Sequence, residues 1–496
     1  MHTREVEQVP RHLTLYLTII IMGAMLALMA STAGAQRMTD EQVLKAVIEG
    51  VTPLPEALGD RLPIRGSRLE AWLPADDAEA LTFLQALADR GIGLSPRWNP
   101  SKRDDSIAES LRMARLQTQL GLPVSVHASR CIYSFFDGSE ETAHIADDGT
   151  SFFDDSFGSR KMGCPFRLEQ RKEPIRQQFI PFLEAYKQAG LTIDFIYVDW
   201  EVDGPIEWNG AWESSKRCRV CREHIPDINN FASFQAALRQ IRSELQRQCY
   251  ADVVKGYFPE VLVSNYSVNP HDGWRYWYDY YEKLPEGAPF EADQLAKYRP
   301  WCHEFEPCGY TFANPVCYTW YDTWSWYPGF ASDDYRWLYN MLKVATNACQ
   351  NTPQSVPVVT WVHWHTTAQP ADTPPVPQMS EGAYKELLWH MLLRGTDGLM
   401  MWCTGEETVK EVQLISEVLG QALAYREFLD QGEPVLFDVP PEPGAVVSAL
   451  RLGNRFLVRR SDFAEIAGPV NVTIGDATVA VPSAPGQCQV IELGAQ

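Results

Sequence analysis

Two carboxylates stand one residue apart at the end of a short apolar segment. In Asp194-Phe-Ile-Tyr-Val-Asp199-Trp-Glu201, β-branched and aromatic residues precede Asp199 and Glu201, which is typical of a buried parallel strand with acids at its C-terminal end. Side chains alternate along a strand, so both carboxylates point the same way, with Cα atoms roughly 6.5 Å apart. Two like charges this close separate the two pKa values, and one acid stays protonated near neutral pH. Such a pair suits glycosidic-bond cleavage; the structural alternative is an acidic strand end that caps a helix or binds an arginine.

The segments around this pair alternate between short apolar stretches and longer helical patterns. We predict strands at 68–73, 92–98, 123–128, 193–199, 260–266, 315–320, 356–363 and 398–403. We predict helices at 77–90, 104–120, 174–190, 231–249, 333–349, 380–394 and 408–429. This order favours an α/β fold, a (β/α)8 TIM barrel rather than an open sheet.

The composition changes along the chain and indicates four parts. We predict a signal peptide at 1–35, an N-terminal helix and linker at 36–66, a catalytic barrel at 67–431 and a small C-terminal antiparallel β-domain at 432–496. The last part is rich in Val, Pro and Gly, with alternating apolar and polar residues and no helical period.

The N-terminus predicts export. Basic residues precede an apolar stretch at 13–30, and Ala33-Gly-Ala35 follows as a cleavage site, so the mature chain would begin at Gln36. We expect a secreted or periplasmic protein without stable membrane insertion once the signal is cleaved. The apolar stretch is long for a signal, so an uncleaved anchor to the cell envelope is the alternative.

The charge of the chain excludes one class of partner and disfavours another. The formal net charge is −21, whereas nucleic-acid binding requires a basic surface. A polyanionic polysaccharide would also be repelled by the average field. We therefore expect a carbohydrate substrate that is neutral, while the oligomeric state is not indicated by the sequence.

The 11 cysteines all lie beyond the predicted signal, and an oxidising compartment would let them pair. Because the number is odd, at least one stays free or pairs with another molecule. Cys218-Arg-Val-Cys221 has the spacing of half a zinc site, but no second CxxC or suitably spaced His pair follows it. We therefore predict a loop disulfide, or bridges to distant cysteines, and a second loop disulfide between Cys302 and Cys308.

Long connections follow three predicted strands, at 129–172, 202–230 and 267–314. They leave the C-terminal ends of strands, where barrel active sites are built, and long loops in compact domains are usually functional. Aromatic rings can face the flat C–H surfaces of sugars. The loops contain Trp208, Trp212, Trp274, Tyr276, Trp277, Tyr278, Tyr280, Tyr281 and Trp301.

The fourth predicted strand resembles the D-G-x-D-x-D-x-E signature of family 18 glycoside hydrolases, the chitinases and their relatives, and the I-D-W-E strand end of hyaluronidases. This resemblance implies that Glu201 is the proton donor. It also implies that Asp199 orients the 2-acetamido group of the substrate, which acts as the nucleophile in place of a second protein carboxylate.

Two further strand ends carry the resemblance. Tyr321-Asp322 is similar to the family's M-x-Y-D, which implies that Tyr321 hydrogen-bonds the acetamido oxygen, and Trp402 resembles the tryptophan at the floor of the sugar pocket. The chain departs from the signature at Phe195, which replaces a Gly, and at Tyr197, which replaces the middle Asp. The hyaluronidase pattern also lacks that Asp.

Other polar and aromatic residues near predicted strand ends complete the expected site. For His363-Trp-His365, substrate hydrogen bonding, packing against aromatic rings and metal binding are alternatives, and an HxH alone is weak evidence for a metal. We predict no metal and no cofactor. The expected substrate-binding residues are Trp402, Asp322, Trp320, His363, His365, Arg97, His127 and Asn265.

We therefore predict a secreted glycoside hydrolase that cleaves a neutral or N-acetylated glycan, with Glu201, Asp199 and Tyr321 as catalytic residues. One alternative is a retaining glycosidase with two protein carboxylates, but the seventh strand, which ends in His363-Trp-His365, has none. Its second acid would come from Glu406 and Glu407 or from Glu304 and Glu306. The other alternative is a non-catalytic glycan-binding barrel, against which the retained Glu201 argues.

Overall fold

The computed structural model describes residues 38–493 except 71, 133–137, 156–160, 201–210, 267, 269–273, 276–298, 301–304, 320–323, 325–329, 366–374, 404, 406 and 476. The predicted signal peptide and four predicted site residues, Glu201, Trp320, Tyr321 and Asp322, lie outside the described residues. Within the described ranges, no helix has the length and apolar character needed to cross a membrane.

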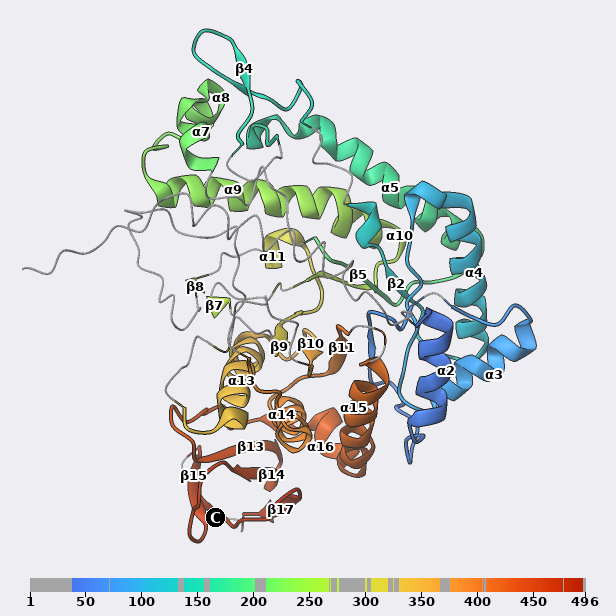
Figure 1. Cartoon of the computed structure of the whole chain (residues 1–496), viewed down its shortest axis with the longest axis vertical. Coiled ribbons are helices and arrows are strands. Elements are labelled where there is room, and N and C mark those ends of the chain that lie inside the picture. The colour runs from blue at the N-terminus through green and yellow to red at the C-terminus, as the bar shows by residue number, and fades with distance from the viewer. Residues whose placement is uncertain are drawn as a thin grey trace, which may run out of the picture.

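Two parallel sheets lie side by side in the middle of the molecule (Figure 1). One has three strands, in the order β2 (Ser125–His127), β5 (Phe195–Val198) and β6 (Leu262–Asn265). The other has four, in the order β1 (Arg65–Gly66), β11 (Gly398–Met401), β10 (Val359–His363) and β9 (Val316–Tyr318). β5, β10 and β11 are buried along their whole length, as expected for parallel strands covered on both faces.

Isolated contacts extend both sheets. Parallel bridges join Ile64 to Ile92 and Arg97 to His127, so the segment between residues 92 and 97 runs from β1 towards β2. Beyond β6, the backbone N–H of Thr311 donates to the carbonyl oxygen of Val263 (2.8 Å). The strand predicted at 92–98 is therefore reduced to single bridges.

The strand predicted at 68–73 is wrong. The observed strand is β1, and the chain turns at residues 67–70, where Arg68 has φ 68°. Gly66 makes this turn possible, because a Cβ there would lie 1.9 Å from the carbonyl oxygen of Met401. Leu69 is nevertheless buried. The apolar residues of this segment therefore indicated burial correctly, although the segment does not pair as a strand.

Each predicted helical segment contains a helix. Polar caps start several of them: Asp76 accepts from the N–H groups of Ala78 and Glu79, and Ser380 from that of Ala383. The main helices are α2 (Asp40–Gly50), α3 (Asp77–Ala88), α4 (Arg103–Gln119), α5 (Glu169–Gln188), α9 (Phe231–Gln246), α13 (Asp333–Asn351), α14 (Glu381–Leu393) and α15 (Thr408–Ala422). Shorter ones are α7 (Trp212–Arg217), α8 (Arg219–His224), α10 (Asp252–Tyr257), α11 (Phe305–Cys308) and α16 (Arg426–Gln431), with single turns η1 (Pro100–Lys102), η2 (Ser129–Cys131), η3 (Pro165–Arg167), η5 (Arg247–Ala251) and η7 (Leu423–Tyr425).

The long predicted loops contain short elements of their own. The connection at 129–172 includes the antiparallel pair β3 (His144–Ile145) and β4 (Ser151–Phe152), and the connection at 202–230 includes α7 and α8. The third connection includes the pair β7 (Trp274–Arg275) and β8 (Arg299–Pro300).

Antiparallel strands form the C-terminal part of the chain (Figure 1). One sheet has the order β12 (Glu433–Pro434), β13 (Ala445–Leu452), β14 (Arg455–Asp462) and β17 (Cys488–Glu492), and β15 (Val470–Ile474) pairs with β16 (Ala477–Val481). Leu393 of α14 and Phe428 of α16 pack against Leu450 and Leu457 of the sheet.

A cluster of aromatic residues joins the two parallel sheets. It includes Tyr197 of β5, Tyr318 of β9, Trp361 of β10 and Met400 of β11, together with Tyr266, which follows β6. Because these strands come from both sheets, the cluster forms an interior layer between them. This layer lies directly behind the strand ends at which the candidate site residues stand.

Candidate functional site

The backbone after β5 is held by hydrogen bonds from both neighbouring strands. The N–H of Asp199 donates to Ser129 Oγ (2.7 Å). The N–H of Trp200 donates to Asn265 Oδ1 (2.7 Å), and Asn265 Nδ2 donates to the carbonyl oxygen of Trp200 (3.1 Å). Asn265 is fully buried at the end of β6. These bonds fix the chain direction immediately before Glu201.

A buried relay of polar side chains ends at Asp199. An ion pair joins Arg97 to Glu70, and the Oε1 atom of Glu70 lies 2.6 Å from His127 Nδ1. His127 Nε2 lies 2.5 Å from Ser129 Oγ. With Nδ1 donating to the carboxylate, Nε2 accepts from the Ser129 hydroxyl, and that oxygen accepts from the N–H of Asp199. Both ring nitrogens of His127 and the Ser129 hydroxyl are therefore paired.

The relay contains a buried ion pair. Burial alone would raise the pKa of Glu70, but the interactions with His127 and Arg97 outweigh it and lower that pKa. The same ion pair outweighs burial at Arg97 and raises its pKa. Both groups are therefore charged at neutral pH. The sequence analysis missed Glu70, although an acid inside an apolar segment was a usable signal.

The same three residues have the order of a Ser–His–acid nucleophile. Two observations favour a positioning role instead. Ser129 is only 4% exposed, and its oxygen already accepts the N–H of Asp199. The relay therefore orients the end of β5.

Tyr197 occupies the position at which the resembled signature has an acid. Its ring stacks on His127 (4.5 Å between centroids, 10° between planes) and meets Trp361 edge-on (5.8 Å). Burial, reinforced by Glu70, raises its pKa well above the usual value, so the phenol is neutral. Asp199 consequently has an uncharged ring where the family pattern would place a second carboxylate.

The ends of β10 and β11 form another part of the site. His363 of β10 meets the Trp402 ring edge-on, with centroids 4.9 Å apart, and Trp402 stacks on Tyr318 of β9 (5.9 Å). His363 is buried, whereas Trp402 is half-buried. The orientation of the Trp402 ring is thus fixed by neighbours on two strands.

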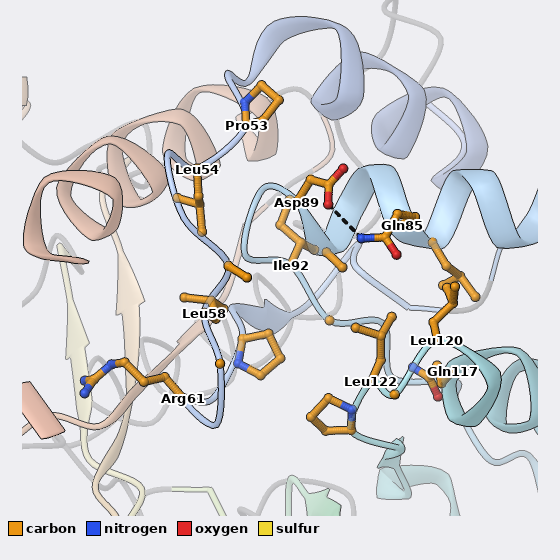
Figure 2. Close-up of a pocket in the computed structure, with 18 of the residues that line it drawn as sticks. Pro53, Leu54, Leu58, Arg61, Gln85, Asp89, Ile92, Gln117, Leu120 and Leu122 are labelled. Atoms are coloured by element: carbon orange, nitrogen blue, oxygen red, sulfur yellow. Dashed lines mark hydrogen bonds between the residues drawn. The ribbon is translucent and has the colours of Figure 1, made fainter. Parts of the chain in front are cut away.

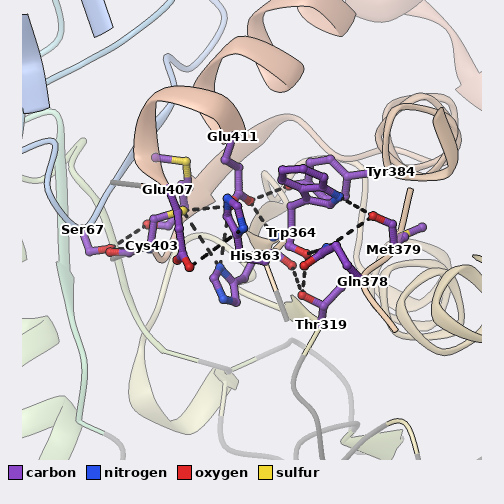
Figure 3. A network of polar contacts seen from close by, with 12 residues as sticks. Ser67, Thr319, His363, Trp364, Gln378, Met379, Tyr384, Cys403, Glu407 and Glu411 are labelled. Atoms are coloured by element: carbon purple, nitrogen blue, oxygen red, sulfur yellow. Dashed lines mark hydrogen bonds and ion pairs between the residues drawn. The ribbon is translucent and has the colours of Figure 1, made fainter. Parts of the chain in front are cut away.

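Glu411, in the first turn of α15, is the centre of a group of polar contacts with His363, Cys403 and Tyr384 (Figure 3). Its Oε1 atom accepts from the N–H of Trp364 (3.0 Å) and the hydroxyl of Tyr384 (2.7 Å), and its Oε2 atom lies 2.7 Å from Cys403 Sγ and 3.6 Å from His363 Nδ1. Burial raises the pKa of Glu411, but hydrogen bonds from His363, Cys403 and Tyr384 outweigh it and lower that pKa. The sequence analysis missed this residue as well.

His363, Cys403 and Glu411 are also close enough to hold a metal ion. Their hydrogen bonds already account for the arrangement, because both Glu411 oxygens have donors. The second histidine of the HxH, His365, has its Nδ1 atom 3.9 Å from Glu407 Oε1. Burial lowers the pKa of His365 despite the two nearby glutamates, so its ring is neutral near pH 7. Of the two histidines of the HxH, only His363 belongs to the described group with Cys403 and Glu411.

A chain of ring contacts connects the two parts of the site. Tyr197 contacts Trp361, Trp361 contacts Tyr266 (6.1 Å), Tyr266 contacts Tyr318 (6.5 Å), and Tyr318 contacts Trp402. The strand that carries Asp199 and the strand that precedes Trp402 are thereby parts of one packed layer.

A cavity of about 570 Å³ lies elsewhere (Figure 2). Its walls include Leu54, Leu58, Ile92, Gln117 and Leu122. Leu122 precedes β2, so the cavity is at the N-terminal ends of the strands, opposite the end that carries Asp199. It does not belong to the candidate site.

No family model matches the chain, and no curated protein matches it. Among solved structures, it is similar to α-L-fucosidase isoenzyme 1 from Paenibacillus thiaminolyticus, with 13% identity over 87% of this chain and 86% of that one, at a TM-score of 0.35. It is also similar to bee venom hyaluronidase, with 16% identity over 59% and 83% and a TM-score of 0.29. A GH18 chitinase from Pseudoalteromonas aurantia matches with 12% identity over 62% and 81% and a TM-score of 0.29. These scores are low, so the residues of this chain carry the functional argument.

Proposed function

We propose that the protein is a glycoside hydrolase that acts on a neutral or N-acetylated glycan. The observation that supports this proposal is the doubly held backbone of Asp199 and Trp200, which follows a parallel strand directly and precedes Glu201 in the sequence. Glu201 is the general acid/base, Asp199 the stabilising carboxylate, Tyr321 a substrate-positioning hydroxyl and Trp402 the stacking floor.

The proposal includes closure of the strands into a (β/α)8 barrel. Parallel pairing runs from β9 through β10 and β11 to β1 and from β2 through β5 to β6. The bridges at Ile92 and Arg97 connect β1 to β2, and the bond from Thr311 connects the segment before β9 to β6. Such a ring would gather all C-terminal strand ends around one opening.

A substrate-assisted route fits the residues at the strand ends. In that route Asp199 polarises a 2-acetamido group, and Glu201 protonates the leaving oxygen. β10 ends in His363 rather than in a carboxylate. A two-carboxylate mechanism remains the alternative, with Glu407 as a second acid close to His365. Secretion through the predicted signal peptide and the predicted domain boundaries are part of the same proposal.

The test is hydrolysis of aryl glycosides and polysaccharides, including N-acetylglucosaminides, by the wild type and by Glu201→Gln. We expect the substitution to lower kcat by roughly 10²–10⁴-fold, because it removes the transferable proton, while glycan binding is retained. Glu213→Gln is the matched control, since Glu213 is exposed on α7, where it pairs with Lys216. An unchanged rate in Glu201→Gln would exclude Glu201 as the acid.

The substrate range separates the mechanisms. Cleavage confined to 2-acetamido sugars supports the substrate-assisted route, whereas cleavage of sugars without that group requires a second protein carboxylate. Binding without any cleavage would instead indicate a glycan-binding barrel.

A further inference from the structure

Four metal-binding side chains meet in a part of the chain that the proposed hydrolysis does not use. They are His144 in β3, Cys164 before η3, and Cys218 and Cys221 at the start of α8. Figure 1 shows β4, α7 and α8 together at one end of α9, away from the parallel sheets. Three segments that are distant in the sequence therefore supply one cluster.

The donor atoms of this cluster are close together and shielded from solvent. Cys164 Sγ lies 3.5 Å from Cys221 Sγ and 3.9 Å from Cys218 Sγ, and Cys221 Sγ lies 3.9 Å from His144 Nδ1. All four donor atoms lie within 4.8 Å of one another. Each of the four residues is fully buried.

The predicted loop disulfide is wrong at Cys218 and Cys221. Neither forms a disulfide, and the separations of 3.5 and 3.9 Å from Cys164 Sγ far exceed the roughly 2.05 Å of a disulfide bond. Cys302 lies outside the described residues, so the predicted Cys302–Cys308 bridge stays a prediction.

Ordinary core packing does not account for the histidine. The ring of His144 stacks on Phe152 (5.1 Å, 18°), and Nε2 is buried without a hydrogen-bond partner among the described residues. Its Nδ1 atom faces the sulfurs, 3.9 Å from that of Cys221, and a thiol is only a weak hydrogen-bonding partner. A metal ion bound at Nδ1 would be a strong partner for this buried ring.

The separations match one tetrahedral ion. Zinc–sulfur bonds of roughly 2.3 Å at tetrahedral angles place two sulfurs about 3.8 Å apart, close to the observed 3.5 and 3.9 Å. The backbone also positions two of the ligands, Cys164 and Cys218. The N–H of Ile145 points to Cys218 Sγ (3.5 Å), and Gly163 allows the close approach that delivers Cys164, because a Cβ there would lie 2.3 Å from the carbonyl oxygen of Thr142.

We propose that His144, Cys164, Cys218 and Cys221 bind one structural Zn²⁺ ion. Three thiolates and one imidazole form a closed Cys3His ligand set, which leaves no position for water or substrate. The ion would join the β3–β4 hairpin, η3 and the α7–α8 segment. The zinc ion, rather than a disulfide, would hold together the long connections that follow β2 and β5.

The first test is metal analysis of the full-length protein, purified without a polyhistidine tag in chelator-treated buffer. We expect about one zinc per chain, with X-ray absorption at the zinc edge giving three sulfurs near 2.3 Å and one nitrogen near 2.0–2.1 Å. Because these readouts use the wild type, they do not depend on the folding of any variant. Less than about a tenth of an equivalent of zinc, a shell of oxygen and nitrogen only, or iron in place of zinc would overturn the proposal.

Single substitutions then assign the ligands. Cys218→Ser and His144→Ala should lower the zinc content at least about tenfold, because each leaves three ligands. Cys349→Ser is the matched control, since Cys349 is a free cysteine whose contact is Thr396 rather than this cluster, and it should keep the full zinc content. Full zinc in both ligand variants would contradict the assignment.

Discussion

At the scale of single residues, the candidate site is organised by side chains that hold the backbone rather than by side chains that face a substrate. Asn265 uses its amide oxygen and its amide nitrogen on the two backbone groups of Trp200. The sequence analysis placed Asn265 among the substrate-binding residues. Its burial and its bonds support a positioning role instead.

Replacing Asn265 separates these roles. We expect Asn265→Ala to lower kcat by roughly 10–100-fold with KM changed less than about threefold, because a small displacement of the acid pair affects the transition state more than binding. Asn265→Asp, which keeps the acceptor, should lose less. Asn351→Ala, at the exposed end of α13, is the control in steady-state kinetics. A raised KM with unchanged kcat would restore the substrate-binding assignment.

Some site residues could be predicted because parallel strands end at a common edge. Asp199, His127, His363 and Trp402 were predicted in this way, and each lies at or directly after the end of a strand. Glu70 and Glu411 were missed, since they reach the site from a turn after β1 and from the first turn of α15. Their partners are far away in sequence, 57 residues for Glu70 and His127, and no local pattern reports such a contact.

At the scale of elements, the sequence predicts which segments are buried better than it predicts which strands pair. The helices could be located because their apolar faces repeat, and some of them also begin at a polar cap such as Asp76 or Ser380. The first strand was misplaced because Leu69 packs in the core without pairing to a neighbour. The zinc ligands were not recognised as a set because Cys164 lies 54 residues before Cys218, a spacing that only the folded chain explains.

Glu411 links α15 to β10 and to α14, and its loss should weaken all three. Glu411→Gln keeps one oxygen that can accept from the N–H of Trp364 and the hydroxyl of Tyr384. It places an –NH2 donor against the thiol of Cys403, which donates to the other oxygen. We expect the free energy of unfolding to fall by about 1–3 kcal/mol for each unsatisfied buried group. Urea unfolding measures this loss.

The control is Glu417→Gln on the same helix, whose partner Lys385 is on the surface. This substitution should change the free energy of unfolding by less than about 1 kcal/mol. Equal losses in both variants would remove the structural role of Glu411.

At the scale of the whole molecule, buried polar groups at α14 connect the part with the parallel sheets to the C-terminal antiparallel sheet. His390 lies between the hydroxyls of Ser448 (2.8 Å) and Ser461 (2.9 Å). Arg394 donates to Ser448 (2.8 Å) and to the carbonyl oxygen of Asp438 (2.8 Å). A buried network of this kind permits only one arrangement of the two parts.

This interface should make stability depend on pH. Burial, together with the charges of Arg394 and Arg459, lowers the pKa of His390 well below its usual value, so the folded protein keeps the ring neutral. The unfolded chain takes up a proton below about pH 6.5. Stability is therefore fully present above that pH and falls below it, by up to about 1.4 kcal/mol per pH unit from this group.

Chemical denaturation between about pH 5 and 8 measures the effect. His390→Gln should have a shallower loss of stability with acid than the wild type, whereas His224→Gln, which alters an exposed histidine on α8, should keep the wild-type slope. Identical slopes for all three proteins would show that His390 is not responsible.

The pairing of β1 with β11 also determines when β1 can find its partner during synthesis of the chain. Arg65 is paired with Met400, so the first strand has no partner on that side until the chain has been extended by a further 335 residues. At about 5–20 residues per second, synthesis of that length takes on the order of tens of seconds. During that interval the edge of β1 is open to incorrect pairing with other strands or with another nascent chain.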